Sequence, residues 1–443
     1  MGGSLLHAAG MQRSVAGSAL ERGGLRYRSS LRRAARAPRH RDEALTHPSQ
    51  PLRVGLVIER FRRDGGGAES VTWRTAHALR DGGDEVSVLA RESDDAPGIA
   101  LHRLRAPRTW QPLRVLRFSR AATDCARRLS LDVVYSLART AEQDVYRAGA
   151  GSHADYLEAR HPGLSGALRR VSPRHAALLA LERRVFRDPD QFVICNSHAV
   201  RRQIVARYAV PEERIAVLYN GVDLETFQPR PEERSRVRDE VDPSGPADAP
   251  VWLFAANDYA RKGLDTALDA LARAQHGRSR LWVAGGHGDP PLDSAWRRRA
   301  LELGIGERVR FLGPRRDLGR VFAAADGLIL PTRYDAFANV CLEAASSGLP
   351  VLTSTANGAA ELFQGIGPAP LPATDASAFA AQLDALASAD ARRAIGAQMR
   401  SMAERHGWAR HVAELRALLR RRVSERRSAA TFSVRRPAFR PGL

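Results

Sequence analysis

The chain has 443 residues, a formal net charge of +20 and 44% hydrophobic residues, so it is longer than one hydrophobic core usually supports and two domains are expected. No run of about 18 apolar residues occurs, which argues against a membrane-spanning helix. The three cysteines are odd in number and unpatterned, which indicates a reducing cytoplasm without structural disulfides.

Both ends of the chain are rich in arginine and poor in apolar residues. Residues 1–50 carry nine Arg against three acids, and residues 426–443 carry five Arg and no acid, so the tails hold 6 and 5 of the 20 net charges. We predict that both are disordered. The first tail could also be an Arg-rich transit peptide or an extension from an upstream start. Because the tails hold 11 of the 20 charges, nucleic-acid binding is only a lower-ranked alternative.

The first predicted strand, 54–58, leads into Gly65, Gly66 and Gly67, and a helix is expected from about Glu69. Glycines have no Cβ, so they let the backbone approach a ligand closely. The alternative is a flexible surface turn. The adjacent acids at 84–85 and 94–95 are interpreted as solvated turns, and no D-x-D cluster follows a strand. No metal and no cofactor are therefore predicted.

Residues 102–120 form a basic segment with six Arg, interleaved with Trp110, Leu113, Leu116 and Phe118. Arginines with interleaved aromatic residues suit an anionic membrane surface, which makes this segment a candidate for peripheral membrane docking. The alternative is a solvated surface loop.

An apolar run at 133–137 is followed by the sequence DVYRAGAGSH, which ends at His153. His153 is either a functional residue or an ordinary exposed histidine, one of 13. Further on, residues 228–250 are rich in Pro and charge, which predicts a linker or surface insertion. Strands alternate with helices on both sides of it, which predicts two parallel sheets. Ligands of such sheets bind at the carboxyl ends of the strands.

Lys262 is the one lysine among 69 basic residues, and it follows Arg261. The pair lies between a predicted strand at 251–255 and a predicted helix at 264–274. Such a pair can clamp phosphate oxygens, with Arg as a planar fork and Lys as a mobile point charge. The alternative is a solvated charge pair in a turn.

Two carboxylates, Asp335 and Glu343, bracket a predicted junction between a loop and a helix at 337–347. The first N–H groups of a helix are unpaired, so this helix start is a ready site for phosphate. Asp335 is expected before the helix and Glu343 two turns into it, where they could hold the hydroxyls of two sugar rings. The alternative is an acid that complements the helix dipole plus one solvated Glu.

From Arg53 to Leu419 the chain resembles the retaining glycosyltransferases of family 4, which have the GT-B architecture. The best-matched pieces are GGGAE at 65–69, CNS at 195–197, YNGVD at 219–223, RKG at 261–263, VAGG at 283–286, VRFLG at 309–313 and the carboxylate pair. The family usually has Glu at position 335 and Gly at position 338, where this chain has Asp335 and Ala338. These departures leave the donor sugar more open than the reaction type.

The resemblance implies an α/β fold with two Rossmann-like parallel-sheet domains that face each other across a cleft. It implies these donor-binding residues: Gly66, Gly67, Arg261, Lys262, Gly285, Asp335, Phe337, Ala338, Asn339 and Glu343. The catalytic residues that it implies are His153, Arg261, Lys262 and Asp335. Arg261 and Lys262 would bind the diphosphate, Glu343 the ribose, Asp335 the transferred sugar, and backbone N–H groups near 337–339 would complete the phosphate cradle. His153 would lie near the reactive carbon.

The expected organisation follows from these assignments: a tail at 1–50, an acceptor-binding domain at 51–228, a linker at 229–250, a nucleotide-sugar-binding domain at 251–405, a helix at 406–425 that returns to the first domain, and a tail at 426–443. The implied reaction moves a hexose from a nucleotide-diphosphate sugar such as UDP-glucose to a lipid-linked glycan. The subgroup that it resembles extends the lipopolysaccharide core, which implies a cytoplasmic protein and a peripheral position on the inner membrane as a further expectation. A nucleotide-sugar epimerase or a polysaccharide synthase of the same fold remains an alternative.

Overall fold

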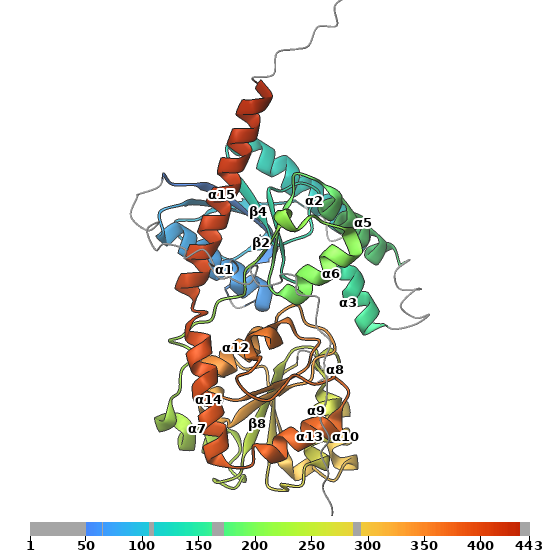
Figure 1. Ribbon diagram of the computed structural model, residues 1–443, viewed down its shortest axis with the longest axis vertical. Helices are drawn as coiled ribbons and strands as arrows, with labels where there is room; N and C mark the ends of the chain where they lie inside the picture. The colour runs from blue at the N-terminus through green and yellow to red at the C-terminus, as the bar shows by residue number, and fades with distance from the viewer. Residues whose placement is uncertain (1–49, 64, 106–109, 162–171, 287–293, 435–443) are drawn as a thin grey trace, which may run out of the picture. The chain divides into compact units, whose positions relative to one another are not determined.

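The computed structural model describes residues 50–63, 65–105, 110–161, 172–286 and 294–434, and within them the chain forms two parallel β-sheets with helices around each (Figure 1). The α/β class and the two parallel-sheet domains are therefore confirmed. Nearly all of the first predicted tail lies outside the described residues.

The first sheet has seven strands in the order β3-β2-β1-β4-β5-β6-β7, and every pairing in it is parallel. Its strands are β1 (Arg53–Phe61), β2 (Glu85–Ser93), β3 (Ala100–Arg103), β4 (Val133–Ser136), β5 (Val145–Ala148), β6 (Phe192–Cys195) and β7 (Ile215–Val217). The central strands are buried along nearly their whole length, as the apolar runs predict.

The helices that accompany the first sheet are α1 (Gly67–Asp81), α2 (Gln111–Arg128), α3 (His153–Arg160), α5 (Pro173–Arg187), α6 (His198–Tyr208) and the 3₁₀ turn η1 (Glu212–Arg214). Two of these helices begin at features that the sequence analysis singles out: α1 at the Gly65–Gly67 turn and α3 at His153. A Ser side chain caps the N-terminus of α3 and of α6 by accepting a backbone hydrogen bond.

The second sheet has five parallel strands in the order β10-β9-β8-β11-β12. Its strands are β8 (Val251–Ala256), β9 (Arg280–Gly285), β10 (Val309–Gly313), β11 (Gly327–Leu330) and β12 (Val351–Thr353). The helical elements around it are α8 (Tyr259–Lys262), α9 (Leu264–Arg273), α10 (Ser294–Glu302), η3 (Gly306–Arg308), α11 (Leu318–Ala324), α12 (Asn339–Ser346), η4 (Gly358–Phe363), α13 (Ala376–Ala385) and α14 (Ala389–Glu404).

The segment predicted as a linker, 229–250, is only partly a connection. It contains η2 (Pro231–Glu233) and α7 (Arg234–Val241), whose Val237 and Val241 are buried in the core of the second domain. The many charged residues of this segment predict an exposed linker rather than a packed helix. In the structure two of them, Arg234 and Arg238, form ion pairs with Asp326 of the second domain.

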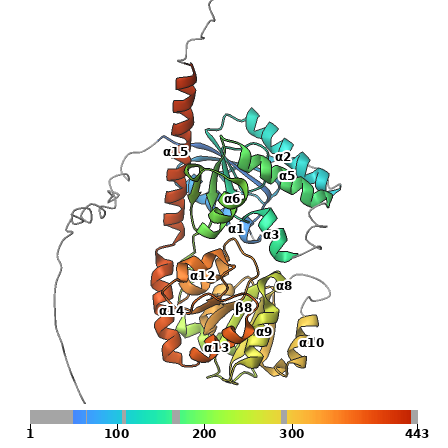
Figure 2. The ribbon, with the colours of Figure 1, turned by 45° about the vertical axis from the view of Figure 1, so that its right-hand side comes forward.

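The last helix, α15 (Trp408–Val434), packs against the first domain, which Figure 2 shows from a second side. Its Val412, Leu415, Leu419 and Val423 recur at spacings of three or four and pack into the core of the first sheet. The helix does not end at 425: residues 426–434 continue it, so the prediction of disorder is wrong for this part. Residues 435–443 lie outside the described residues.

Asp84 also corrects the sequence interpretation, because it is not a solvated turn residue. Its side chain is buried and accepts hydrogen bonds from Arg416 and Arg420 of α15 and from the backbone N–H of Leu52. The carboxylate thus fastens the last helix to the start of the first strand. Within the described ranges, no helix is both long and apolar enough to cross a membrane.

Candidate active site

Arg261 and Lys262 lie on the short helix α8, just beyond the carboxyl end of β8. The Asp258 side chain caps α8 by accepting from the Arg261 backbone N–H at 3.2 Å, and it also accepts from Arg160 of α3 at 2.7 Å. Gly263 ends α8 with a φ of +80°, and a Cβ there would stand 2.1 Å from the Pro331 carbonyl oxygen. The glycine therefore lets the two cations sit directly against the loop that follows β11.

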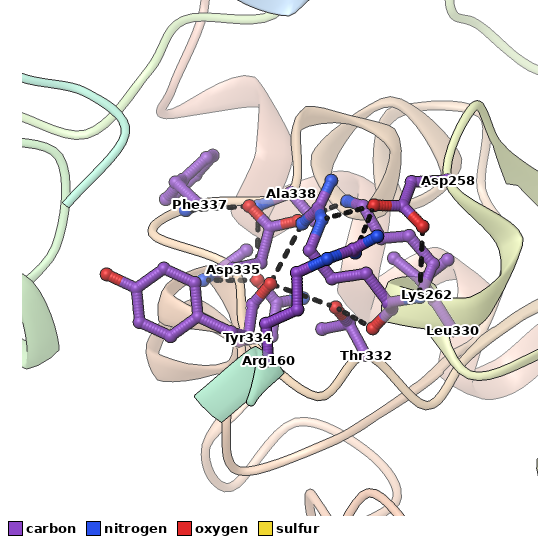
Figure 3. Close-up of polar contacts among 12 residues, drawn as sticks. Arg160, Asp258, Lys262, Leu330, Thr332, Tyr334, Asp335, Phe337 and Ala338 are labelled. Carbon is purple, nitrogen blue, oxygen red and sulfur yellow. Dashed lines mark hydrogen bonds and ion pairs between the residues drawn. The ribbon is translucent and has the colours of Figure 1, made fainter. Parts of the chain in front are cut away.

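Asp335 lies in that loop and faces Lys262, as Figure 3 shows. It accepts from Lys262 Nζ in a close ion pair, from Arg261 Nη1 at 3.4 Å and from the Phe337 backbone N–H at 3.2 Å. Burial raises the pKa of Asp335, but Lys262 and Arg261 outweigh this and hold it below its usual value. The structure thus brings three of the four predicted catalytic residues into direct contact.

Two of the three backbone N–H groups at 337–339 that were predicted to bind phosphate already have acceptors within the protein. The Phe337 N–H is taken by the Asp335 side chain, and the Ala338 N–H donates to Asn357 Oδ1 at 3.1 Å. Among the described residues, no acceptor is found for the backbone N–H groups of Asn339 and Val340 at the start of α12. Asn339 remains a donor-binding candidate, and Val340 is a candidate that sequence reasoning missed.

Glu343 lies on α12, one turn beyond its start, and it is half-buried. In the described part of the chain its carboxylate has no hydrogen-bond partner, so it is free to accept from a ligand. Burial raises the pKa of Glu343 to about 7, although Arg74 and Lys262 act in the opposite direction. A carboxyl group of this kind titrates within the range in which enzymes are assayed.

His153 is buried at the N-terminus of α3, and its Nε2 shares a 3.0 Å hydrogen bond with Nδ1 of His175. Burial and the nearby Arg139 lower the pKa of His153 to about 4, so the ring is neutral at pH 7. The preceding Ser152 carbonyl accepts from Tyr334, the neighbour of Asp335, at 3.3 Å. His153 is therefore not an ordinary exposed histidine, and its segment contacts the Asp335 loop.

The three predicted glycines occupy two places. Gly285 ends β9 with a φ of +102°, and a Cβ there would stand 2.0 Å from the Ala256 carbonyl oxygen at the end of β8. Gly66 and Gly67 start α1 and line a cavity of about 440 Å³ in the first domain, together with Arg60, Arg114, Arg139 and Arg174. The Gly66 N–H already donates to the Glu69 carboxylate, whereas the Gly67 N–H has no acceptor among the residues that the structure describes.

Three supporting residues were not singled out from the sequence as site residues: Asn357, Glu182 and Asn220. Asn357 pairs with Asp335 in an isolated β-bridge and holds Ala338. Glu182 accepts from the backbone N–H groups at the start of α3. Asn220 lies in the YNGVD motif, which is the one local signal that pointed to it. No group of three or more metal-ligating side chains occurs in the described ranges.

The chain matches two family models, one on each sheet. Residues 65–226 match Glycosyltransferase Family 4 and residues 249–389 match Glycosyl transferases group 1. A D-inositol 3-phosphate glycosyltransferase of Mycobacterium marinum is 30% identical over 265 residues, which is 58% of this chain and 55% of that protein. The chain spans about half the length of the curated relatives that it matches.

Solved structures share the fold over most of the chain. WaaG, a glycosyltransferase involved in lipopolysaccharide biosynthesis, superposes with a TM-score of 0.69 at 22% identity and covers 79% of this chain and 95% of its own. Anabaena Alr3699/HepE in complex with UDP and glucose gives 0.64 at 19% identity, with 83% and 99% covered. One glycosyltransferase model thus falls on each of the two sheets, Glycosyltransferase Family 4 on the first and Glycosyl transferases group 1 on the second, and the fold is the GT-B architecture of these solved structures.

Proposed function

We propose that this protein is a retaining hexosyltransferase that uses a nucleotide-diphosphate sugar. The observation that carries the proposal is the convergence of Arg261, Lys262 and the open N–H groups of α12 at the carboxyl ends of β8 and β11. Cleavage of the sugar–phosphate bond builds negative charge on the departing diphosphate. Fixed cations and N–H dipoles aimed at that charge lower the barrier.

The remaining site residues suit the other parts of such a donor. Glu343 has a carboxylate free to accept from the two ribose hydroxyls, and the neutral His153 can exchange hydrogen bonds with a sugar hydroxyl. Asp335 holds Lys262 and Arg261 in place, and its second oxygen could accept from the transferred sugar. UDP-glucose is the donor we propose to test first, which the HepE complex with UDP and glucose supports.

For the acceptor we propose a lipopolysaccharide core or a related cell-surface glycan, bound in the first domain; its likeness to WaaG supports this choice. A phosphorylated polyol is a second candidate, because sequence relatives are named D-inositol 3-phosphate glycosyltransferases and four arginines line the cavity beside Gly67. Release of nucleoside diphosphate, measured with each acceptor in turn, separates the two. If neither acceptor leads to release of nucleoside diphosphate, both candidates are contradicted.

The same assay addresses the alternatives from other classes. An epimerase would convert the sugar nucleotide without releasing nucleoside diphosphate, whereas a transferase releases it only when an acceptor is present. Salt-dependent retardation of oligonucleotides, without any binding of sugar nucleotides, would instead favour nucleic-acid binding. Heat stabilisation by a panel of sugar nucleotides would identify the donor.

The raised pKa of Glu343 gives a pH dependence for donor binding. Above pH 7 the group is a carboxylate that accepts from the ribose, and below pH 7 it is protonated and a poorer acceptor. Between pH 8 and pH 6 its ionised fraction falls about tenfold, so we expect the KM for the donor to rise by about that factor. In Glu343→Gln the KM should be high at both pH values; a wild-type KM that is constant over this range would contradict the assignment.

We also propose that the start of α2 docks on an anionic membrane surface. Trp110 and Leu116 are 66% and 46% exposed, and Arg117 and Arg120 are exposed beside them. Phe118, predicted as part of this surface, is instead buried in the core, and residues 106–109 lie outside the described residues. The proposed surface is therefore smaller than the basic segment 102–120.

Co-sedimentation with vesicles tests this docking. We expect binding to anionic vesicles at low salt, weaker binding to neutral ones, and a clear loss in Trp110→Ala/Leu116→Ala. Leu301→Ala is a matched control, because Leu301 is 69% exposed on α10, away from this segment. Equal binding to neutral and anionic vesicles would rule out the electrostatic part.

A further inference from the structure

A chain of three polar side chains leads from the interior of the first domain to the start of α12. Arg147 of β5 is buried, and its Nη2 donates to Asn220 Oδ1 at 2.5 Å and to the Leu218 carbonyl oxygen at 3.1 Å. Asn220 is also buried, and its Nδ2 donates to Asn339 Oδ1 at 2.7 Å. Asn339 is the first residue of α12 and is only half-buried.

This series of hydrogen bonds has a fixed direction because a guanidinium group can donate hydrogen bonds but cannot accept them. Arg147 forces the oxygen of the Asn220 carboxamide to face it, so the Asn220 amino group must face Asn339. The Asn339 oxygen then faces Asn220, and the Asn339 amino group is left on the far side. The orientation of both amides, which cannot be told from their shape alone, follows from the arginine.

The outward-facing amino group of Asn339 lies at the predicted diphosphate site. A Cβ built on Gly67 would stand 3.6 Å from Asn339 Nδ2, so this group is next to the start of α1. Within the described residues, Nδ2 has no acceptor, and neither do the backbone N–H groups of Asn339 and Val340. Three donors at the start of α12 are thus left open, which suits an anionic ligand.

We propose that Arg147 and Asn220 are positioning residues that hold the Asn339 amino group toward the donor diphosphate. The inference rests on the proposed function, because it takes a nucleoside diphosphate as the ligand. It adds to that function a side-chain contact with the sugar donor, made by Asn339. It also explains what the buried Arg147 and Asn220 of the first domain contribute to donor binding. Neither Arg147 nor Asn220 touches the ligand; each acts through Asn339.

The variant Asn220→Asp reverses the direction without changing the shape. An Asp at this position still accepts from Arg147, but it cannot donate to Asn339. The Asn339 amide must then turn its amino group toward the new carboxylate and its oxygen toward the diphosphate. We expect the affinity for nucleoside diphosphate to fall by at least about tenfold, while the melting temperature stays at or above that of the wild type.

A double-mutant cycle separates this effect from the added negative charge. In the Asn339→Ala background no amide can turn, so Asn220→Asp should lower the affinity there by no more than about threefold, through charge alone. Affinities are measured by calorimetry with UDP, GDP and ADP in parallel, and the tightest binder is used for all four proteins. An equal loss of affinity from Asn220→Asp in both backgrounds would overturn the proposed positioning of Asn339 by Arg147 and Asn220, but it would leave the proposed function intact.

A wild-type protein that binds none of the three nucleotides would overturn both proposals. A further measurement needs only Asn339→Ala, in case the double variant does not fold. The side-chain NH₂ resonances of Asn339, assigned by their loss in that variant, should shift when the wild type is saturated with the nucleotide. If the Asn339 NH₂ resonances do not change at saturation, the proposed contact between Asn339 and the diphosphate is overturned.

Discussion

Replacing Lys262 with alanine is expected to lower turnover by roughly 10²-fold or more, the scale for loss of one group that stabilises developing charge. Lys262 is the single lysine of the chain, while the other 68 of its 69 basic residues are arginine. Its Nζ is held against Asp335 beside Arg261, in a part of the structure where solvent is largely excluded. A compact mobile ammonium group can follow a phosphate oxygen as charge develops, which a planar guanidinium group cannot do equally well.

Steady-state release of nucleoside diphosphate measures this effect. Lys262→Arg keeps the charge and should recover only part of the activity, because the fork geometry does not fit the same place. Arg393→Ala is a matched control, since Arg393 is an exposed cation on α14 with one local ion pair. Near-normal turnover in Lys262→Ala would contradict the proposed chemistry.

The single lysine also permits a chemical version of the same test. An amine-selective acetylating reagent modifies Lys262 and the α-amino group alone among the amines of the chain. Acetylation removes the charge of Lys262, so we expect inactivation, with protection by the bound nucleotide. Inactivation that proceeds equally in Lys262→Arg would show that the modified group is a different one.

What the sequence could predict was local. The contact among Arg261, Lys262 and Asp335 can be predicted because glycine, charge and strand patterns mark the carboxyl ends of β8 and β11, and parallel strands bring these ends together. The exact donors at α12 could not be found in this way. Asn357 lies 19 residues after Ala338 and takes its N–H, and no sequence pattern signals that a side chain will claim a backbone group.

Contacts between residues far apart in the sequence cannot be predicted from local patterns either. The sequence pattern around Asp84 predicts a solvated turn because the partners of Asp84, Arg416 and Arg420, lie more than 300 residues away. The end of α15 was missed because residues 426–434 are rich in Arg and Ser, yet they continue a helix whose earlier turns are anchored by buried Leu415 and Leu419. Composition describes how a segment would behave alone, whereas an anchored helix can extend beyond its anchor.

Glu182 is the residue for which sequence reasoning had least to offer and for which we expect the largest loss of stability. It lies on α5 among apolar residues, and its side chain is fully buried. It accepts hydrogen bonds from five groups: Arg139 Nε, Ser152 Oγ, the backbone N–H of His153, the backbone N–H of Ala154 and Tyr208 Oη. The carboxylate thus joins the start of α3 to α5 and α6.

Glu182→Ala is expected to lower the free energy of unfolding of the first domain by about 3–5 kcal/mol, the scale for breaking a buried ion pair by removing one partner. The loss arises because Arg139 would stay buried without its carboxylate and the start of α3 would lose the acceptor of two N–H groups. Hydrogen exchange of amides in α3 and α5 measures this locally, which avoids assuming that two domains unfold as one.

Glu212→Ala serves as the control for this change, because Glu212 is an exposed acid whose ion pair with Arg201 should contribute about 1 kcal/mol or less. Glu182→Gln separates charge from shape: it can still accept from the backbone of α3 but leaves Arg139 without a counter-charge. Exchange rates in Glu182→Ala that match those of the control would mean that the helix start is held by its Ser152 cap alone. Because His153 is the first residue of α3, a loosened helix start should also lower turnover, so stability and activity are expected to fall together here. Lys262→Ala should lower activity much more than stability, because Asp335 keeps its ion pair with Arg261.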